Sequence, residues 1–179
     1  MNYELAQAES DNFPKSKMRH LEYLAMELTP TSRGSFAFDV LTFMVAFDQY
    51  PRVSNTTIPA QDFELASKLI SEEVKEMFDG FNKFEASQSL ENLVEFADGA
   101  IDTIYVILWT LLKFNLPVDK LFAEVQRSNM AKLNPDGTYT KNEHGKVKKP
   151  EGWTPPNIHQ LLVEHFDLAE WNAISNTRK

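Results

Sequence analysis

The sequence contains no cysteine, which excludes a disulfide scaffold and any cysteine-ligated zinc site. Glycine is scarce as well, because six residues in 179 are few for the turns of an all-β protein. The most apolar stretch, residues 104–112, is less than half as long as the roughly 20 residues of a membrane-spanning helix. Residues 1–4 show no basic start of a signal peptide. We therefore expect a cytoplasmic protein with no membrane segment.

The residues that are present indicate a folded, acidic protein. Hydrophobic residues make up 42% and aromatic residues 12%, which excludes disorder along the whole chain and favours one domain with one core. The 26 acidic residues outnumber the 18 basic ones, so the net charge is −8. Such a surface repels phosphate backbones, and we expect no nucleic-acid polymer as a partner.

Helical periodicity runs through most of the chain. Apolar spacing and capping residues predict helices over residues 16–28, 36–49, 61–78, 90–114, 118–130 and 158–172. Asp79-Gly80 is expected to end the third of these helices. Residues 131–156 are rich in Lys, Gly, Asn and Pro, which predicts an irregular, basic loop. The expected architecture is an all-α helical bundle, with an extension at 1–34, a main domain at 35–156 and a C-terminal helical segment at 157–179 that packs on the same domain.

The apolar helix at 90–114 is interrupted by acidic residues. Glu95, Asp98 and Asp102 are spaced by three and seven residues, so all three lie on one narrow stripe of a helix. Stacked carboxylates repel one another, and burying them unpaired is costly. The stripe is either the solvated face of this helix or an acidic site that receives a positive group, and the apolar sequence around it favours the second interpretation.

The preceding helix carries a matching acidic set. Glu73 and Glu76 are spaced like Glu95 and Asp98, and Glu72 lies beside them. A short connection makes the two helices antiparallel neighbours, which can bring the two pairs face to face. An oxygen-only site of this kind suits Mg²⁺, and Mn²⁺ is the natural substitute.

These motifs, with later ones, resemble those of a known family. Residues 72–76 (EEVKE) and 95–98 (EFAD) are similar to the EExxE and ExxD motifs of MazG-like nucleotide pyrophosphohydrolases. Residues 128–133 (SNMAKL), 145–150 (GKVKKP) and 152–156 (GWTPP) follow in the order seen in the phosphoribosyl-ATP pyrophosphohydrolase-like branch of bacteria and phages. The resemblance covers roughly residues 36–156. It implies a four-helix-bundle core of the all-α NTP pyrophosphohydrolase type, with extra helices at both ends.

The resemblance also implies roles for individual residues. It assigns metal binding to four carboxylates, Glu73, Glu76, Glu95 and Asp98. It assigns contacts with substrate phosphates to Asn129 and Lys132. Asn129 is alternatively a helix C-cap, and one residue can serve both roles. In the basic loop, Lys146 and Lys149 are either further phosphate ligands on a lid or ordinary solvated lysines.

The expected function is metal-dependent hydrolysis of an NTP or dNTP to its monophosphate and pyrophosphate. A carboxylate outside the metal set, first Glu72 and then Asp102, would take the proton of the attacking water. Phosphoribosyl-ATP hydrolysis and non-catalytic nucleotide or metal binding are the alternatives. The apolar surplus of the helices and the resemblance together predict a homodimer or homotetramer, unless the terminal helices cover the core of a monomer.

Overall fold

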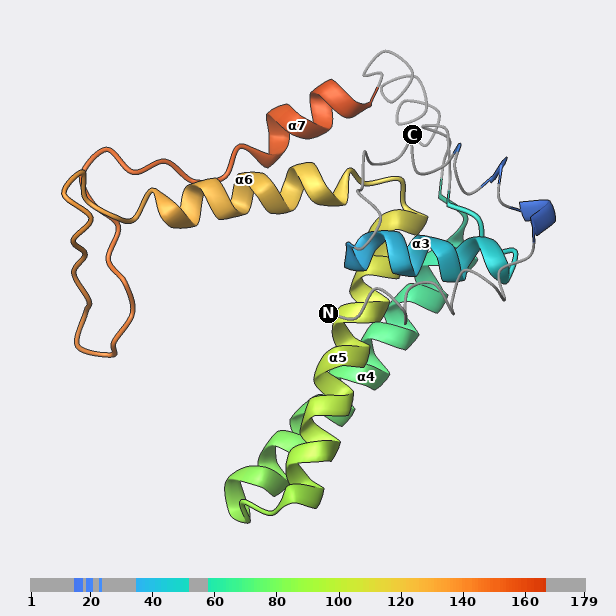
Figure 1. Ribbon diagram of the computed structural model, residues 1–179, viewed down its shortest axis with the longest axis horizontal. Helices are drawn as coiled ribbons and strands as arrows, with labels where there is room; N and C mark the ends of the chain where they lie inside the picture. The colour runs from blue at the N-terminus through green and yellow to red at the C-terminus, as the bar shows by residue number, and fades with distance from the viewer. Residues whose placement is uncertain (1–14, 18, 21–22, 24–34, 52–57, 167–179) are drawn as a thin grey trace.

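The computed structural model describes residues 15–17, 19–20, 23, 35–51 and 58–166 (Figure 1). Its elements are a 3₁₀ turn, η1 (Lys15–Lys17), and the α-helices α3 (Phe36–Ala46), α4 (Ala60–Ala86), α5 (Leu90–Lys113), α6 (Val118–Met130) and α7 (Ile158–His165). The prediction of an all-α fold is confirmed. Within the described residues, β-type pairing is limited to one isolated bridge between Lys141 and Val147 in the irregular loop. Most of the helix predicted at 16–28, and the part of the last helix beyond residue 166, lie outside the described residues.

Side-chain caps place the starts of three helices where the sequence predicts them. The hydroxyl oxygens of Ser35 and Ser89 accept hydrogen bonds from backbone N–H groups in the first turns of α3 and α5. The side chain of Asn157 does the same for α7. Each cap satisfies one of the N–H groups that a helix start leaves without a partner.

Two helices end in the same left-handed turn. Asp48 and Asn115 both have a φ of 58°, a conformation that Asp and Asn tolerate better than most residues. The N–H of the next residue then bonds a carbonyl five positions back, from Gln49 to Met44 at 2.7 Å and from Leu116 to Leu111 at 2.9 Å. This turn ends α3 at Ala46, three residues before its predicted end.

The predicted end of the helix at Asp79-Gly80 is wrong, because α4 continues to Ala86. Gly80 is buried inside the helix, where it faces the backbone of α5. A glycine near a predicted helix end suggests a C-cap, but here its missing side chain serves helix packing instead.

The core lies where α3, α4 and α5 meet. Its buried apolar residues are Ala37, Val40, Leu41, Met44, Val45, Ala66, Trp109, Leu112 and Val118. The indole N–H of Trp109 donates to the side-chain oxygen of Gln49 at 2.8 Å, which satisfies the one polar group that this buried ring carries. α5 contacts α3, α4 and α6, as expected for the central helix.

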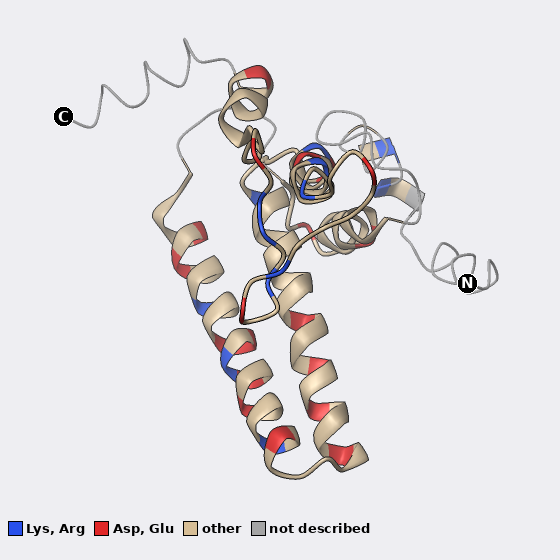
Figure 2. Cartoon of the chain, turned by 90° about the vertical axis from the view of Figure 1, so that its left-hand side faces the viewer, with Lys and Arg blue, Asp and Glu red and all other residues tan. Residues whose placement is uncertain are grey.

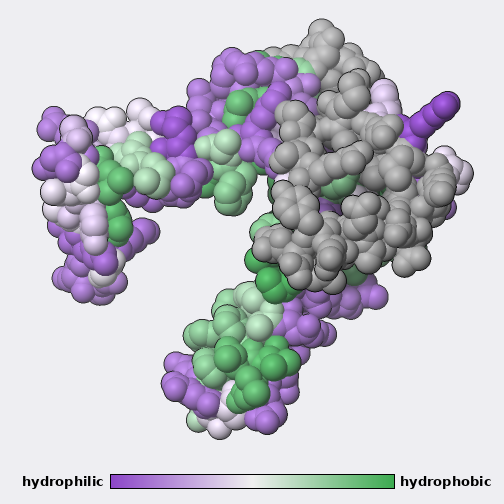
Figure 3. All heavy atoms as spheres, in the orientation of Figure 1, coloured by the Kyte–Doolittle hydropathy of each residue, from purple (hydrophilic) through white to green (hydrophobic). Residues whose placement is uncertain are grey.

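Beyond this core, α4 and α5 form a long antiparallel hairpin with much apolar surface exposed (Figures 1 and 3). Its exposed apolar side chains are Phe78, Phe81, Leu90, Leu93, Val94, Ile101 and Ile104. From the core end of α5, α6 extends away from the hairpin in another direction, α7 packs along α6, and the loop 131–156 lies at the far end of α6.

No single helix in the described ranges is both long enough and apolar enough to cross a membrane. α5 and α6 meet both criteria only when they are taken together, and they are bent by 118° at the break between them.

Candidate active site

Two glycines set the register of the α4–α5 hairpin. A Cβ atom on Gly80 would lie 2.7 Å from the backbone nitrogen of Phe96, and one on Gly99 would lie 2.7 Å from that of Met77. The two helix backbones therefore touch at these points, one turn apart. This contact fixes which acidic residues of α4 lie opposite which acidic residues of α5.

Glu73 is the half-buried centre of a group of carboxylates from both helices, here called the acidic cluster. Partial desolvation raises the pKa of Glu73 above its usual value, and the negative charge of Asp102 on α5 raises it further. Glu76, Glu72 and Asp98 act in the same direction. Of the six carboxylates selected from the sequence, four therefore act on a fifth, Glu73, and they come from the two helices that carry bands of acidic residues in Figure 2.

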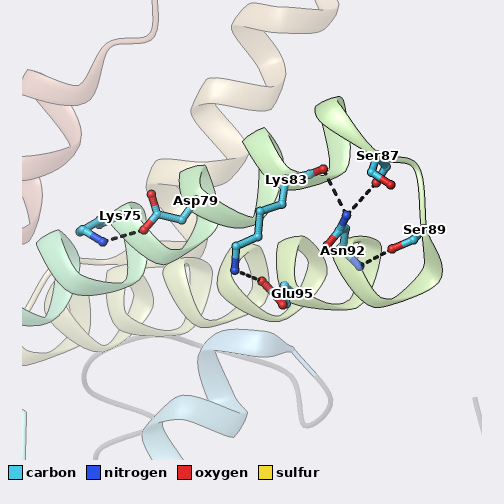
Figure 4. A network of polar contacts seen from close by, with 7 residues as sticks. All are labelled: Lys75, Asp79, Lys83, Ser87, Ser89, Asn92 and Glu95. Carbon is cyan, nitrogen blue, oxygen red and sulfur yellow. Dashed lines mark hydrogen bonds and ion pairs between the residues drawn. The ribbon is translucent and has the colours of Figure 1, made fainter.

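The sixth carboxylate, Glu95, is engaged elsewhere. It accepts a hydrogen bond from the ammonium group of Lys83 near the tip of the hairpin (Figure 4). Both side chains are about half exposed. Lys83 was not among the residues expected at the site, because Asp79-Gly80 predicts a helix end before it. The signal that could have extended the helix is the apolar spacing of Phe78, Phe81 and Phe84.

Other lysines of α4 pair along their own helix. Lys75 bonds Asp79 at 2.6 Å, and the Nζ atom of Lys68 lies 3.8 Å from a carboxylate oxygen of Glu72. Each of these pairs joins residues four positions apart on an exposed surface, where such pairs add little stability. Glu72 therefore lies at the edge of the acidic cluster, next to a cation.

The donor set of the acidic cluster fits a hard divalent cation, because it offers only carboxylate oxygens. As the side chains stand, no three His, Asp or Glu residues in the described part of the chain are arranged closely enough to hold a metal ion. Glu95, Asp98 and Asp102 are all exposed, so the expectation of an enclosed acidic site is not met within one chain. Ligation by these residues would need side-chain rotation toward a shared point, and exposed side chains permit that.

The residues expected to contact phosphates lie on a different part of the molecule. The Oδ1 atom of Asn129, at the end of α6, accepts a hydrogen bond from Lys132 Nζ at 2.7 Å. Lys146 and Lys149 lie in the loop that follows. Figure 1 shows this loop at the end of α6, apart from the α4–α5 hairpin. A single chain thus brings Asn129 and Lys132 together, but it does not bring them to the acidic cluster.

α6 and α7 are joined by a polar clamp that the sequence analysis did not identify. The Nε and Nη2 atoms of Arg127 each donate to a carboxylate oxygen of Glu124 at 2.7 Å. The backbone N–H of Asn157 donates to the same carboxylate at 2.8 Å. These bonds lower the pKa of Glu124 to about 2. A shallow pocket beside the clamp is lined by α6, α7 and residues 154–157. The clamp fixes the start of α7 on α6, and it contributes no group to the acidic cluster.

Comparison with known protein families identifies the segment that carries the acidic cluster. Residues 41–129 match the family model described as phosphoribosyl-ATP pyrophosphohydrolase. The match begins in α3, includes all of α4 and α5, and ends at Asn129. A comparison with curated proteins finds no match.

Proposed function

Because residues 41–129 of this chain belong to the phosphoribosyl-ATP pyrophosphohydrolase family, within the MazG-like all-α NTP pyrophosphohydrolase superfamily, we propose that it hydrolyses a nucleoside triphosphate to its monophosphate and pyrophosphate. Membership of the family supports pyrophosphohydrolase chemistry, the hydrolysis of an acid anhydride. The observation that carries the proposal is the acidic cluster, in which carboxylates from both α4 and α5 raise the pKa of Glu73. A triphosphate can approach such a cluster only together with divalent cations.

The metal-binding residues of this proposal are Glu73, Glu76, Glu95 and Asp98. Mg²⁺ at this place, with Mn²⁺ as a substitute, would screen the phosphate charges and lower the pKa of a bound water. Glu95 would have to leave Lys83 to take part. The cost of that exchange is small, because exposed ion pairs contribute only about 0–1 kcal/mol.

The remaining carboxylates supply the proton acceptor. Glu72 is the first choice, since it adjoins Glu73 in sequence and stands at the edge of the acidic cluster, where water has access. Asp102 is the second choice, because its charge is the one that acts most strongly on Glu73. Either carboxylate would hold the attacking water in line with the α-phosphorus and accept its proton.

The phosphate-binding residues would come from a second copy of the chain. Asn129 and Lys132 lie at the end of α6, and Figure 1 shows that this end of α6 is apart from the hairpin. The hairpin in turn exposes the apolar side chains that a partner copy would cover. A homodimer or homotetramer would therefore bring the basic loop of one copy to the acidic cluster of another.

Hydrolysis in ¹⁸O-labelled water tests the cleavage position. With the full-length protein, Mg²⁺ and each canonical NTP and dNTP in turn, we expect monophosphate and pyrophosphate as products, with ¹⁸O in the monophosphate. Label in the pyrophosphate would mean attack at the β-phosphorus and would contradict the proposal. Binding of triphosphate without turnover of any substrate would identify a non-catalytic nucleotide-binding protein.

Phosphoribosyl-ATP is the second candidate substrate, and the family description itself favours it. It has the same triphosphate group as an NTP, so the acidic cluster does not distinguish the two. The ratio of kcat/KM for phosphoribosyl-ATP to that for the best NTP decides between them. A ratio well above one would replace the NTP with phosphoribosyl-ATP and leave the cleavage chemistry unchanged.

A further inference from the structure

The basic loop is closed at its base by two hydrogen bonds that run in opposite directions. The indole N–H of Trp153 donates to the backbone carbonyl of Ser128 at 2.8 Å. The hydroxyl of Ser128 donates to the carbonyl of Thr154 at 3.0 Å. Ser128 is 1% exposed, so both bonds are shielded from water. The chain therefore leaves α6 and returns to it at the same point.

The indole of Trp153 also carries a lysine on its face. The Nζ atom of Lys149 lies 4.0 Å from the centre of the Trp153 ring, within the range of a cation–π interaction. A tight turn makes this contact possible: the N–H of Trp153 bonds the carbonyl of Pro150 at 3.2 Å, and Gly152 has a φ of 76°. A left-handed φ favours glycine at this position. The turn thus folds Lys149 back over the ring.

A chain of contacts links Lys149 to the end of α6. Lys149 lies on Trp153, Trp153 is bonded to Ser128, and Ser128 precedes Asn129 in the sequence. Asn129 is in turn bonded to Lys132. Two ammonium groups and one amide are therefore held at one end of α6, although Lys149 is distant from the other two in sequence.

Lys146 occupies a different place in the same loop. The backbone N–H of Lys146 donates to the Oδ1 atom of Asn142 at 2.8 Å, in the turn that forms the far end of the loop. The bridge between Lys141 and Val147 separates this turn from the base. Lys146 and Lys149 have the same charge and are both exposed, so they form a matched pair that differs in position.

We infer that Trp153 is a positioning residue that holds Lys149 beside Asn129 and Lys132, and that these three groups form the phosphate-binding end of the substrate site, without Lys146. The inference rests on the proposed function and extends it to the loop outside the matched family segment. Trp153 fits this role because one side chain supplies both an N–H that anchors the loop and a ring face that orients a cation. An ammonium group oriented in advance loses less conformational entropy when it binds a polyphosphate.

Steady-state kinetics of the full-length protein with Mg²⁺ and its best triphosphate substrate test the inference. We expect Lys149→Ala to raise KM about tenfold or more with kcat nearly unchanged, since a charge-assisted hydrogen bond is lost. The matched control, Lys146→Ala, is expected to change KM by less than about twofold. Lys149→Arg is expected to restore most of the affinity, because guanidinium also stacks on indole and binds phosphate.

A double-mutant cycle tests the part played by Trp153. Trp153→Phe keeps an aromatic face but loses the N–H, so we expect KM to rise while Lys149 is present. The double variant with Lys149→Ala should be no worse than Lys149→Ala alone, because the effect of Trp153 passes through Lys149. A general structural role of Trp153 would instead give additive losses and a lower kcat.

Binding of inorganic pyrophosphate, followed by indole fluorescence, separates this inference from the proposed function. We expect a change in emission that Trp153→Phe abolishes and Lys149→Ala weakens about tenfold. If that pattern is seen and no triphosphate is hydrolysed, the proposed function fails and the anion site stands. If triphosphates are hydrolysed and Lys149→Ala equals Lys146→Ala in KM and in pyrophosphate binding, the inference is overturned and the proposed function stands.

Discussion

Gly80 of α4 and Phe96 of α5 are in backbone contact, since a Cβ atom on Gly80 would lie 2.7 Å from the nitrogen and 2.8 Å from the Cα of Phe96. Gly99 and Met77 repeat this contact one turn away. Both acidic pairs lie within five residues of these contacts in sequence, so the glycines govern the spacing between the carboxylates of the two helices.

Gly80→Ala should destabilise the protein, although alanine is the better helix former. Helix propensity alone would add about 1 kcal/mol of stability. The new methyl group would meet backbone atoms that cannot move aside, and overpacking of this kind costs about 1–3 kcal/mol, occasionally more. We therefore expect a lower free energy of unfolding, measured by urea denaturation, and weaker hydrolysis. Asn82→Ala, at an exposed position of the same helix, is the control for a general effect of alanine substitution. A more stable Gly80→Ala variant would refute the close contact.

Glu73→Gln should abolish metal-dependent hydrolysis without unfolding the protein. The change removes a central carboxylate of the acidic cluster, and we expect a loss of about 100-fold or more in kcat/KM. Removing one of several like charges also relieves repulsion, so the Tm without divalent ions should stay the same or rise.

Glu85→Gln is the matched control for this variant. Glu85 is an exposed residue of the same helix, 12 positions and about 18 Å further along. It should keep wild-type turnover and wild-type stabilisation by Mg²⁺. Near-wild-type turnover of both Glu73→Gln and Asp98→Asn would show that the metal assignment is wrong.

Lys83→Met should strengthen Mg²⁺ binding if Glu95 is a metal ligand. The variant frees Glu95 from the ion pair that holds it near the hairpin tip. An exposed pair is worth about 0–1 kcal/mol, which corresponds to a gain in affinity of up to about fivefold, measured by calorimetry. Lys75→Met is the control, since it releases Asp79, which has no role in the proposal. Equal Mg²⁺ affinities of the wild type and Lys83→Met would argue that Glu95 is not a ligand.

The clamp between α6 and α7 should make stability depend on pH through Glu124. Its pKa is lowered from 4.5 to about 2, first by the hydrogen bonds from Arg127 and then by the N–H of Asn157. A lowered carboxyl pKa stabilises the fold above the unfolded-state value, and the contribution is lost as the pH falls from about 4.5 to about 2. The Tm difference between the wild type and Glu124→Gln should therefore be largest above pH 5 and shrink toward pH 2. A difference that is constant over this range would mean that the carboxylate charge is not what holds the clamp.

The exposed face of the hairpin should be the main contact between copies of the chain. Ile101 is 63% exposed on α5, and Ile101→Glu would place a charge in that contact. We expect light scattering to report a dimer or tetramer for the wild type and a smaller species for the variant, with reduced turnover. Ser71→Glu, an exposed polar position on α4, should leave the assembly intact. An active wild type near the 20.5 kDa chain mass at all concentrations would show that one copy suffices.

The helical architecture could be predicted from the amino-acid sequence, and so could the acidic residues that share a helix face. Ser35, Ser89 and Asn157 cap helices by bonds to residues three positions away, so local sequence was sufficient to place these starts. The carboxylate pairs could also be found, because helix periodicity alone puts residues spaced by three on one face.

Contacts between residues distant in sequence could be identified only from the packing of the helices. Gly80 is of a residue type that often ends a helix, but it lies inside α4 and packs against the backbone of Phe96. Glu95 is three residues from Asp98 and shares its helix face, but its carboxylate accepts a hydrogen bond from Lys83 on the other helix. The indole N–H of Trp153 is bonded to the carbonyl of Ser128, 25 residues earlier. Local periodicity fixes which residues share a helix face, whereas the closeness of two backbones and the choice of an ion partner depend on how separate helices pack.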